Sequence, residues 1–138
     1  MNKYKKVMLI YGGISSEREI SIISSKGIND SLIRNNYEVI KIDADEDLES
    51  QIKKHNPDVI FNALHGTWGE DGKVQKIIEL TNVPYTNSGI RASELAMDKH
   101  KSSEIFTKIN LNYPNTVLSS LKSIKHEHIM DYPYVLKP

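Results

Sequence analysis

The stretch Val7-Met-Leu-Ile-Tyr-Gly-Gly13 decides the fold class of this chain. A continuous apolar run ended by two glycines is typical of a buried strand in a parallel sheet. A helical pattern follows, because Ser16 and Glu19 have capping-box spacing and apolar residues then recur at helical intervals on roughly one face. The residues of that face are Ile20, Ile23, Gly27, Ile28 and Leu32.

Strands and helices alternate along the next part of the chain. We predict strands at residues 37–42 and 59–64, a short extended segment at 83–86, and helices at 47–55 and 73–81. This alternation indicates an α/β fold, a parallel sheet with helices on both faces. Two further helices are predicted at 91–97 and 100–109, and two strands at 113–119 and 132–137. Because the rhythm changes after Met97, we expect a first domain at 1–96 and a second at 97–138.

Composition excludes several classes of function. The 138 residues are 38% hydrophobic and 26% charged, as in a globular protein, and 18 basic side chains balance 18 acidic ones. Without net charge, neither nucleic acid nor a membrane surface is an expected partner. The absence of cysteine excludes disulfides and thiolate metal sites. The apolar run at 7–11 is too short for a signal peptide or a membrane span, so we expect a cytoplasmic protein.

Two loops are expected at the carboxyl edge of the sheet, where open α/β folds bind ligands. The first, Gly12-Gly-Ile-Ser-Ser-Glu17, is neither Gly-x-Gly-x-x-Gly nor a phosphate loop. Its Glu17 either receives a ligand ammonium or only complements the dipole of the following helix.

The second loop carries His65, Glu70 and Asp71, which either position a substrate or serve the loop itself. In the latter case His65 bonds a carbonyl and the two acids begin a helix. The spacing of these residues does not make a metal site. Trp68 is either a wall of a ligand site or an anchor of the loop.

Two lysines complete the set of candidates. Lys137 lies at the end of the apolar stretch Tyr132-Pro-Tyr-Val-Leu-Lys-Pro138. If its ammonium is buried there, an anion must bind it; the alternative is that the strand end is solvated and the ammonium needs no partner. Lys99 is the second candidate. The chain stops directly after this expected strand, and we therefore expect a fragment of a longer protein.

Five segments in register resemble the signatures of D-alanine–D-alanine ligases. They are Gly12-Gly-Ile-Ser-Ser-Glu-Arg-Glu-Ile-Ser21, Ala63-Leu-His-Gly-Thr-Trp-Gly-Glu-Asp-Gly72 with Gln75, Pro84-Tyr-Thr-Asn-Ser-Gly89 with Ser93, Met97-Asp-Lys99, and the stretch from Tyr132 to Pro138. The resemblance implies a Rossmann-like pre-ATP-grasp domain that binds substrate, followed by the truncated start of an ATP-grasp domain.

The resemblance also implies a reaction. ATP phosphorylates the carboxylate of one D-alanine, the amine of a second attacks the acyl phosphate, and phosphate leaves. The dipeptide is a peptidoglycan precursor made in the bacterial cytoplasm, by an enzyme expected to be a homodimer. Glu17 matches a catalytic-site glutamate that holds the ammonium of the first D-alanine, and His65 lines that subsite. Lys99 and Lys137 match lysines that reach the ATP phosphates.

Some family features are absent or altered. Asn87 stands where a glycine is usual. The family's phosphate loop and its Mg²⁺ ligands would lie beyond residue 138, so we expect no metal ligand in this segment and no activity from it alone. Two alternatives remain open: a non-catalytic remnant or binding module of the same fold, and a sister ligase that makes D-alanyl-D-lactate.

Overall fold

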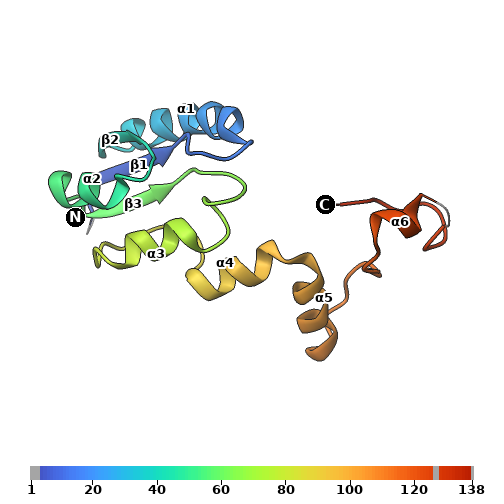
Figure 1. Cartoon of the computed structure of the whole chain (residues 1–138). Helices are drawn as coiled ribbons and strands as arrows, with labels where there is room; N and C mark the ends of the chain where they lie inside the picture. Colours follow the sequence, from blue (N-terminus) through green and yellow to red (C-terminus); the bar gives the residue numbers. More distant parts are fainter. Residues whose placement is uncertain (1–3, 126–127, 138) are drawn as a thin grey trace. The chain divides into compact units, whose positions relative to one another are not determined.

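The structure is a computed structural model, and it describes residues 4–125 and 128–137. The chain divides into two compact units, Met1–Met97 and Asp98–Pro138 (Figure 1). This division lies next to the boundary expected after residue 96. The assignment of the second unit to an ATP-grasp domain stays a prediction. Within the described ranges, no helix combines the length and apolar character that crossing a membrane requires.

A parallel sheet forms the centre of the first unit. Its strands are β1 (Lys6–Tyr11), β2 (Glu38–Asp43) and β3 (Val59–Asn62), in the order β2-β1-β3. The segment 83–86 extends the sheet beyond β3, since Ile60 donates to the carbonyl of Pro84 and accepts from the amide of Thr86. The predicted α/β fold and its strands are confirmed in this unit.

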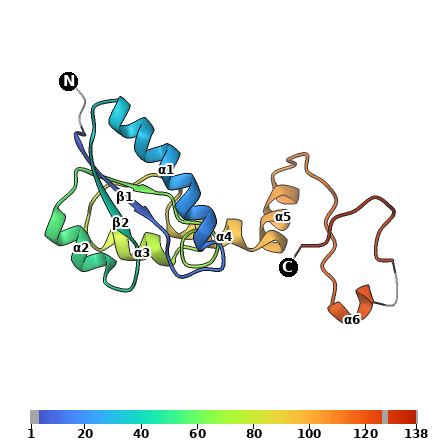
Figure 2. The ribbon, with the colours of Figure 1, turned by 90° about the horizontal axis from the view of Figure 1, so that it is seen from above.

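Helices cover both faces of this sheet. Helix α1 (Arg18–Arg34) lies on one face, and α2 (Leu48–His55) and α3 (Lys73–Glu79) lie on the other (Figure 2). A fourth helix, α4 (Ile90–Met97), ends the unit. Side chains alternate along a strand, so every second residue of β1 faces α2 and α3. The fully buried residues of that layer are Met8, Ile10, Leu48, Ile52, Ile60, Val74 and Ile78.

Helix α1 differs from the sequence prediction in two ways. The structure buries Ser21 and Ser25, whereas Ile20 and Ile23 of the predicted apolar face are 54% and 62% exposed. Small hydroxyl side chains let the helix approach the sheet closely and bond its backbone, which isoleucines cannot do. The predicted capping box is also wrong, because the helix begins at Arg18, after Ser16, and no side chain caps it.

The connections place the loops after β1 and β3 at a topological switch point. From β1 the chain crosses by α1 to β2, and from β3 it continues past α3 to the extended segment on the opposite side. The two connections therefore leave adjacent strands in opposite directions, as right-handed crossovers require in this strand order. In open α/β sheets ligands bind at such points.

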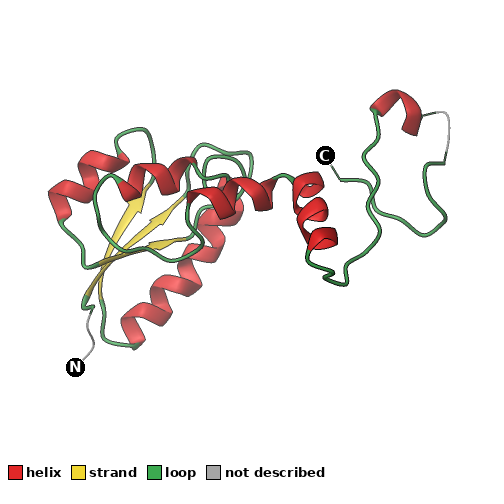
Figure 3. Cartoon of the chain, turned by 90° about the horizontal axis from the view of Figure 1, so that it is seen from below, coloured by secondary structure: helices red, strands yellow, loops and turns green. Residues whose placement is uncertain are grey.

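The second unit contains α5 (Lys99–Lys108) and α6 (Leu121–Ile124). The strands predicted at 113–119 and 132–137 are wrong: the described residues after Met97 contain helices and loops but no strand (Figure 3). A strand needs a neighbouring strand to bond, and the described part of this unit supplies none. Accordingly Leu118 and Val135 are 71% and 79% exposed, and Lys137 is exposed instead of lying in a buried strand.

Candidate functional site

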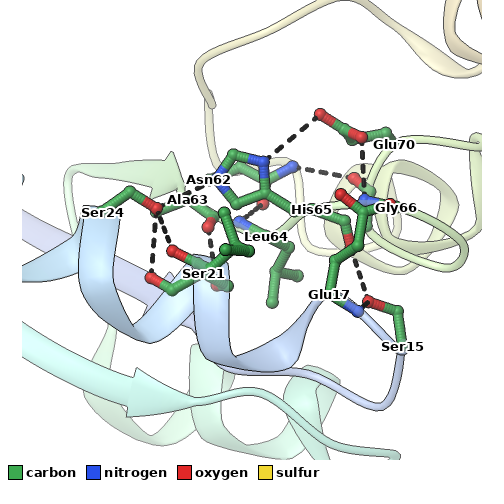
Figure 4. A network of polar contacts seen from close by, with 12 residues as sticks. Ser15, Glu17, Ser21, Ser24, Asn62, Ala63, Leu64, His65, Gly66 and Glu70 are labelled. Carbon is green, nitrogen blue, oxygen red and sulfur yellow. Dashed lines mark hydrogen bonds and ion pairs between the residues drawn. The ribbon is translucent and has the colours of Figure 1, made fainter.

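The structure brings Glu17 and His65 together at the carboxyl edge of the sheet (Figure 4). A Cβ atom placed on Gly66 would lie 2.7 Å from Glu17 Oε1, so the carboxylate lies directly over the residue that follows His65. The hydroxyl of Ser15 donates to the carbonyl of His65 at 2.7 Å and accepts the amide N–H of Glu17 at 3.1 Å. The expectation that both loops meet at one edge is confirmed.

Glycines make this close approach possible. Gly12 and Gly13 have φ values of 74° and 78°, in the left-handed region that side chains disfavour. A Cβ on Gly13 would lie 2.9 Å from Leu64 Cδ2, and one on Gly12 would overlap the carboxylate of Asp43. Gly-Gly after β1 is therefore required by both backbone conformation and space.

Ser21 fixes the two loops to one another. Its hydroxyl accepts the amide N–H of Gly12 at 2.8 Å and donates to the carbonyl of Ala63 at 2.7 Å. The Ser21 side chain is completely buried, so water cannot compete for these two hydrogen bonds. The loop after β1 is thereby tied to the end of β3.

A second tie joins the first loop to β2. The Arg18 guanidinium donates to both carboxylate oxygens of Asp43, at 2.6 and 2.5 Å, and to the carbonyl of Gly13 at 3.1 Å. The hydrogen bond from Arg18 is the main cause that lowers the pKa of Asp43. Arg18 is thus occupied by Asp43 and Gly13, and no ion pair between Arg18 and Glu17 is found.

Two carboxylates give the site a negative character. Glu17 is exposed, and among residues 4–125 and 128–137 no hydrogen bond or ion pair to its carboxylate is found. Glu70 Oε2 accepts the amide N–H of Gly66 at 2.8 Å, and Oε1 lies 3.9 Å from His65 Nδ1. Gly66 therefore has a carboxylate on each side, an arrangement that favours a cationic ligand group.

Asp71 belongs to the loop and not to the site. Burial acts to raise its pKa, but hydrogen bonds from the backbone of Trp68 and from Lys73 outweigh it, so the pKa is lowered. Its carboxylate accepts the amide N–H of Lys73 at 3.2 Å and forms an ion pair with the Lys73 ammonium at 3.0 Å. Asp71 therefore holds the start of α3, which is the second of the two roles considered for it.

The contacts of the His65 ring and of Trp68 distinguish between the roles proposed for each. His65 is partly buried, and its Nε2 lies 2.9 Å from the Ser24 hydroxyl, so the ring bonds a serine rather than a carbonyl. Trp68 packs against the buried core and adopts a φ of 72°. Its carbonyl accepts the amide N–H of Val74. These contacts identify Trp68 as an anchor of the loop.

Lys99 and Lys137 belong to the second unit. Both side chains are exposed, and the described ranges of the chain contain no hydrogen bond or ion pair made by either ammonium. Lys99 is the first residue of α5, whose N-terminus is capped by the Asp98 side chain through the amide of Lys101 at 3.0 Å. Their predicted contact with phosphate stays a prediction.

Sequence reasoning missed the serines that organise the site. The sequence alone assigned no role to Ser15, Ser21 or Ser24. The signal lay in α1: Ser21 and Ser24 or Ser25 recur at helical spacing within an otherwise apolar segment. Serines that share a buried helix face need hydrogen-bond partners, which a neighbouring element can supply.

Comparison with known proteins supports one family. A family model described as "D-ala D-ala ligase N-terminus" matches residues 43–88. The chain is 47% identical over 138 residues to a D-alanine–D-alanine ligase of Parvibaculum lavamentivorans, covering 100% of this chain and 45% of that protein. A ligase of the same name from Rickettsia typhi is 42% identical, with 97% of this chain and 42% of that protein covered.

Solved structures agree with these sequence matches. D-alanine–D-alanine ligase from Bacillus anthracis, in a crystal structure with ATP, superposes with a TM-score of 0.71 at 32% identity, covering 83% of this chain and 38% of that chain. The chain spans less than half the length of the curated relatives it matches. It belongs to the D-alanine–D-alanine ligase family, and it matches the amino-terminal portion of that family's members.

Proposed function

We propose that this chain supplies the first D-alanine site of an ATP-dependent ligase that joins two D-alanines through an acyl phosphate. The observation that carries the proposal is the Glu17 carboxylate, which has no partner among the described residues and is held beside His65 at the switch point between β1 and β3. The dipeptide product is a peptidoglycan precursor. We therefore propose a bacterial cytoplasmic enzyme. Its resemblance to the family leads us to propose that it acts as a homodimer.

The charge of the site suits the ammonium end of an amino acid. An ammonium carries three N–H donors and needs acceptors around it. Glu17 offers both carboxylate oxygens, and Glu70 Oε1 remains available beside the His65 ring. A free amino acid with its ammonium against Glu17 would have its carboxylate turned away from these acids. Repulsion between the carboxylate of the amino acid and the carboxylates of Glu17 and Glu70 favours this orientation.

ATP is the second substrate in this proposal. Exposed lysine ammoniums without a described partner have the right chemistry to meet phosphate oxygens, so we assign this role to Lys99 and Lys137. The ATP complex of the relative from Bacillus anthracis supports ATP use in the family.

Magnesium is also part of the proposal, as the ion that neutralises phosphate charge in such transfers. Within the described ranges, no three His, Cys, Asp or Glu side chains are grouped as a metal site would require.

The test is the substitution Glu17→Gln in a ligase that contains this segment. The amide keeps the shape of the side chain but loses the charge that faces the ammonium. A hydrogen bond to a charged group contributes about 1.5–3 kcal/mol, so the KM for the first D-alanine should rise roughly ten- to hundredfold. The KM for ATP should stay unchanged.

Glu19→Gln is the matched control, because Glu19 is exposed on the first turn of the same helix. Its substitution should change neither constant. An equal rise of the two KM values in Glu17→Gln, or no rise for D-alanine, would reject the proposed site.

A further inference from the structure

The hydroxyl of Ser24 lies between the backbone of its own helix and the ring of His65. Its Oγ is 2.7 Å from the carbonyl oxygen of Ile20, 3.3 Å from that of Ser21 and 2.9 Å from His65 Nε2 (Figure 4). A hydroxyl has one hydrogen to donate, whereas a carbonyl has none. Two oxygens 2.7 Å apart need a hydrogen between them, so Ser24 donates to Ile20.

The direction of this bond determines the hydrogen on the ring. Because the Ser24 hydrogen is directed at the helix carbonyl, the 2.9 Å contact with His65 requires the ring to donate from Nε2. In a neutral imidazole the other nitrogen, Nδ1, then has a bare lone pair and accepts. The helix backbone thus selects one of the two tautomers of His65.

The bare Nδ1 faces the acidic side of the site. It lies 3.9 Å from Glu70 Oε1, and the amide of Gly66 binds the other oxygen of the same carboxylate. Nδ1 and Oε1 are both acceptors and cannot bond each other. A ligand group with two N–H bonds could donate to both, because two hydrogen bonds of about 2.8 Å can bridge atoms at this separation. With Glu17 above Gly66, acceptors line this edge of the loop.

We propose that Ser24 is a positioning residue, which holds His65 as the Nε2–H tautomer and so directs the Nδ1 lone pair at the ammonium of the bound amino acid. The identity of that ligand rests on the proposed function, but the tautomer does not. Ser15 holds the carbonyl of His65 from the same side, so the ring and the main chain of this residue are both fixed by the α1 region.

Ser25 separates this role from a purely local one. Its hydroxyl also donates to a carbonyl of the same helix, that of Ile22 at 2.8 Å, but no hydrogen bond between Ser25 and His65 is found. A serine that only bonds its own helix is common. Ser25→Ala is therefore a matched control for Ser24→Ala.

The experiment is a long-range ¹H–¹⁵N correlation spectrum of the histidine rings in the 138-residue chain, assigned with His65→Asn. It is recorded at about pH 8.5, roughly two units above the ordinary histidine pKa of about 6.5. The unsubstituted chain should show His65 with its hydrogen on Nε2. Ser24→Ala should produce a mixture of tautomers, Ser24→Thr should restore the original one, and Ser25→Ala should leave it unchanged.

Two results would overturn the inference: a hydrogen on Nδ1 in the unsubstituted chain, which no folding defect of a variant can explain, or an unchanged tautomer in a folded Ser24→Ala chain. In the intact ligase, Ser24→Ala should raise the KM for D-alanine by about two- to tenfold and leave that for ATP unchanged. The spectrum requires no substrate. Failure of the inference therefore appears in the spectrum, and failure of the proposed function appears in the response of the ligase to Glu17→Gln.

Discussion

Ser21→Ala should destabilise the first unit far more than its size suggests. The substitution removes one oxygen atom, but that oxygen is the partner of the Gly12 amide at 2.8 Å and of the Ala63 carbonyl at 2.7 Å. Ser21 is completely buried, and Ala63 is 5% exposed, so water cannot replace the lost bonds without a rearrangement. Two backbone groups are left unsatisfied in the interior.

The magnitude follows from the number of orphaned groups. A buried donor or acceptor without a partner costs about 1–3 kcal/mol, and two of them give roughly 2–6 kcal/mol before relaxation. We expect a loss of about 3 kcal/mol in the free energy of unfolding. Ser25 is equally buried on the same helix, but its hydroxyl bonds only the carbonyl of Ile22. Ser25→Ala should therefore cost less than about 1 kcal/mol.

The assay is urea unfolding followed by tryptophan fluorescence. Trp68 is the single tryptophan of the chain and packs on the core of the first unit, so its signal reports that unit. With an m-value of about 1.5 kcal/mol/M, Ser21→Ala should lower the midpoint by about 2 M without changing m. Equal midpoints for Ser21→Ala and Ser25→Ala would refute the bridge between the two loops.

Substitutions at three more positions test the turns and charges around the site. Gly66→Ala adds a Cβ 2.7 Å from Glu17 Oε1 at a φ of 70°, so in a complete ligase it should raise the KM for D-alanine but not for ATP; an unaltered D-alanine KM would argue against the close packing. Asn87 has a φ of 82°, which explains why glycine is usual at this position. Asn87→Gly should therefore leave the melting temperature unchanged, whereas Asn87→Ala should cost about 1 kcal/mol of stability. Equal melting temperatures for the two variants would contradict this explanation. Asp43 has a pKa lowered below 3.8, chiefly by its hydrogen bond from Arg18, so its contribution to stability is complete above that pH and is lost as the pH falls through the lowered pKa. Urea midpoints of the unsubstituted chain and Asp43→Asn should therefore differ at neutral pH and converge in acid; a gap that persists in acid would point to a cause other than this ionisation.

Much of the first unit could be predicted because its signals are local. The apolar run at 7–11 and its two glycines specify a buried strand and a turn, since burial on both faces needs continuous apolar residues. The alternation of such runs with helical patterns then requires a parallel sheet. Strand direction alone brings the loops that carry Glu17 and His65 to the same edge. The roles proposed for these residues come from the resemblance to the ligases.

Local signals were insufficient after Met97. The stretch 132–137 has the composition of a strand, but strand formation requires hydrogen bonds to a neighbouring strand, and the described part of the second unit offers none. Apolar side chains such as Val135 stay exposed there. Composition indicates which residues can form a strand; the partner decides whether they do.

The sequence by itself determined the order and type of the elements in the first unit, because burial periodicity is a property of neighbouring residues. Only the tertiary structure decided which side of α1 turns inward. Helical spacing identifies residues that share a face, but the surface that receives them selects the face. The sheet edge presents the amide of Gly12, the carbonyl of Ala63 and the ring of His65, and these polar groups are satisfied by Ser21 and Ser24 rather than by the neighbouring isoleucines.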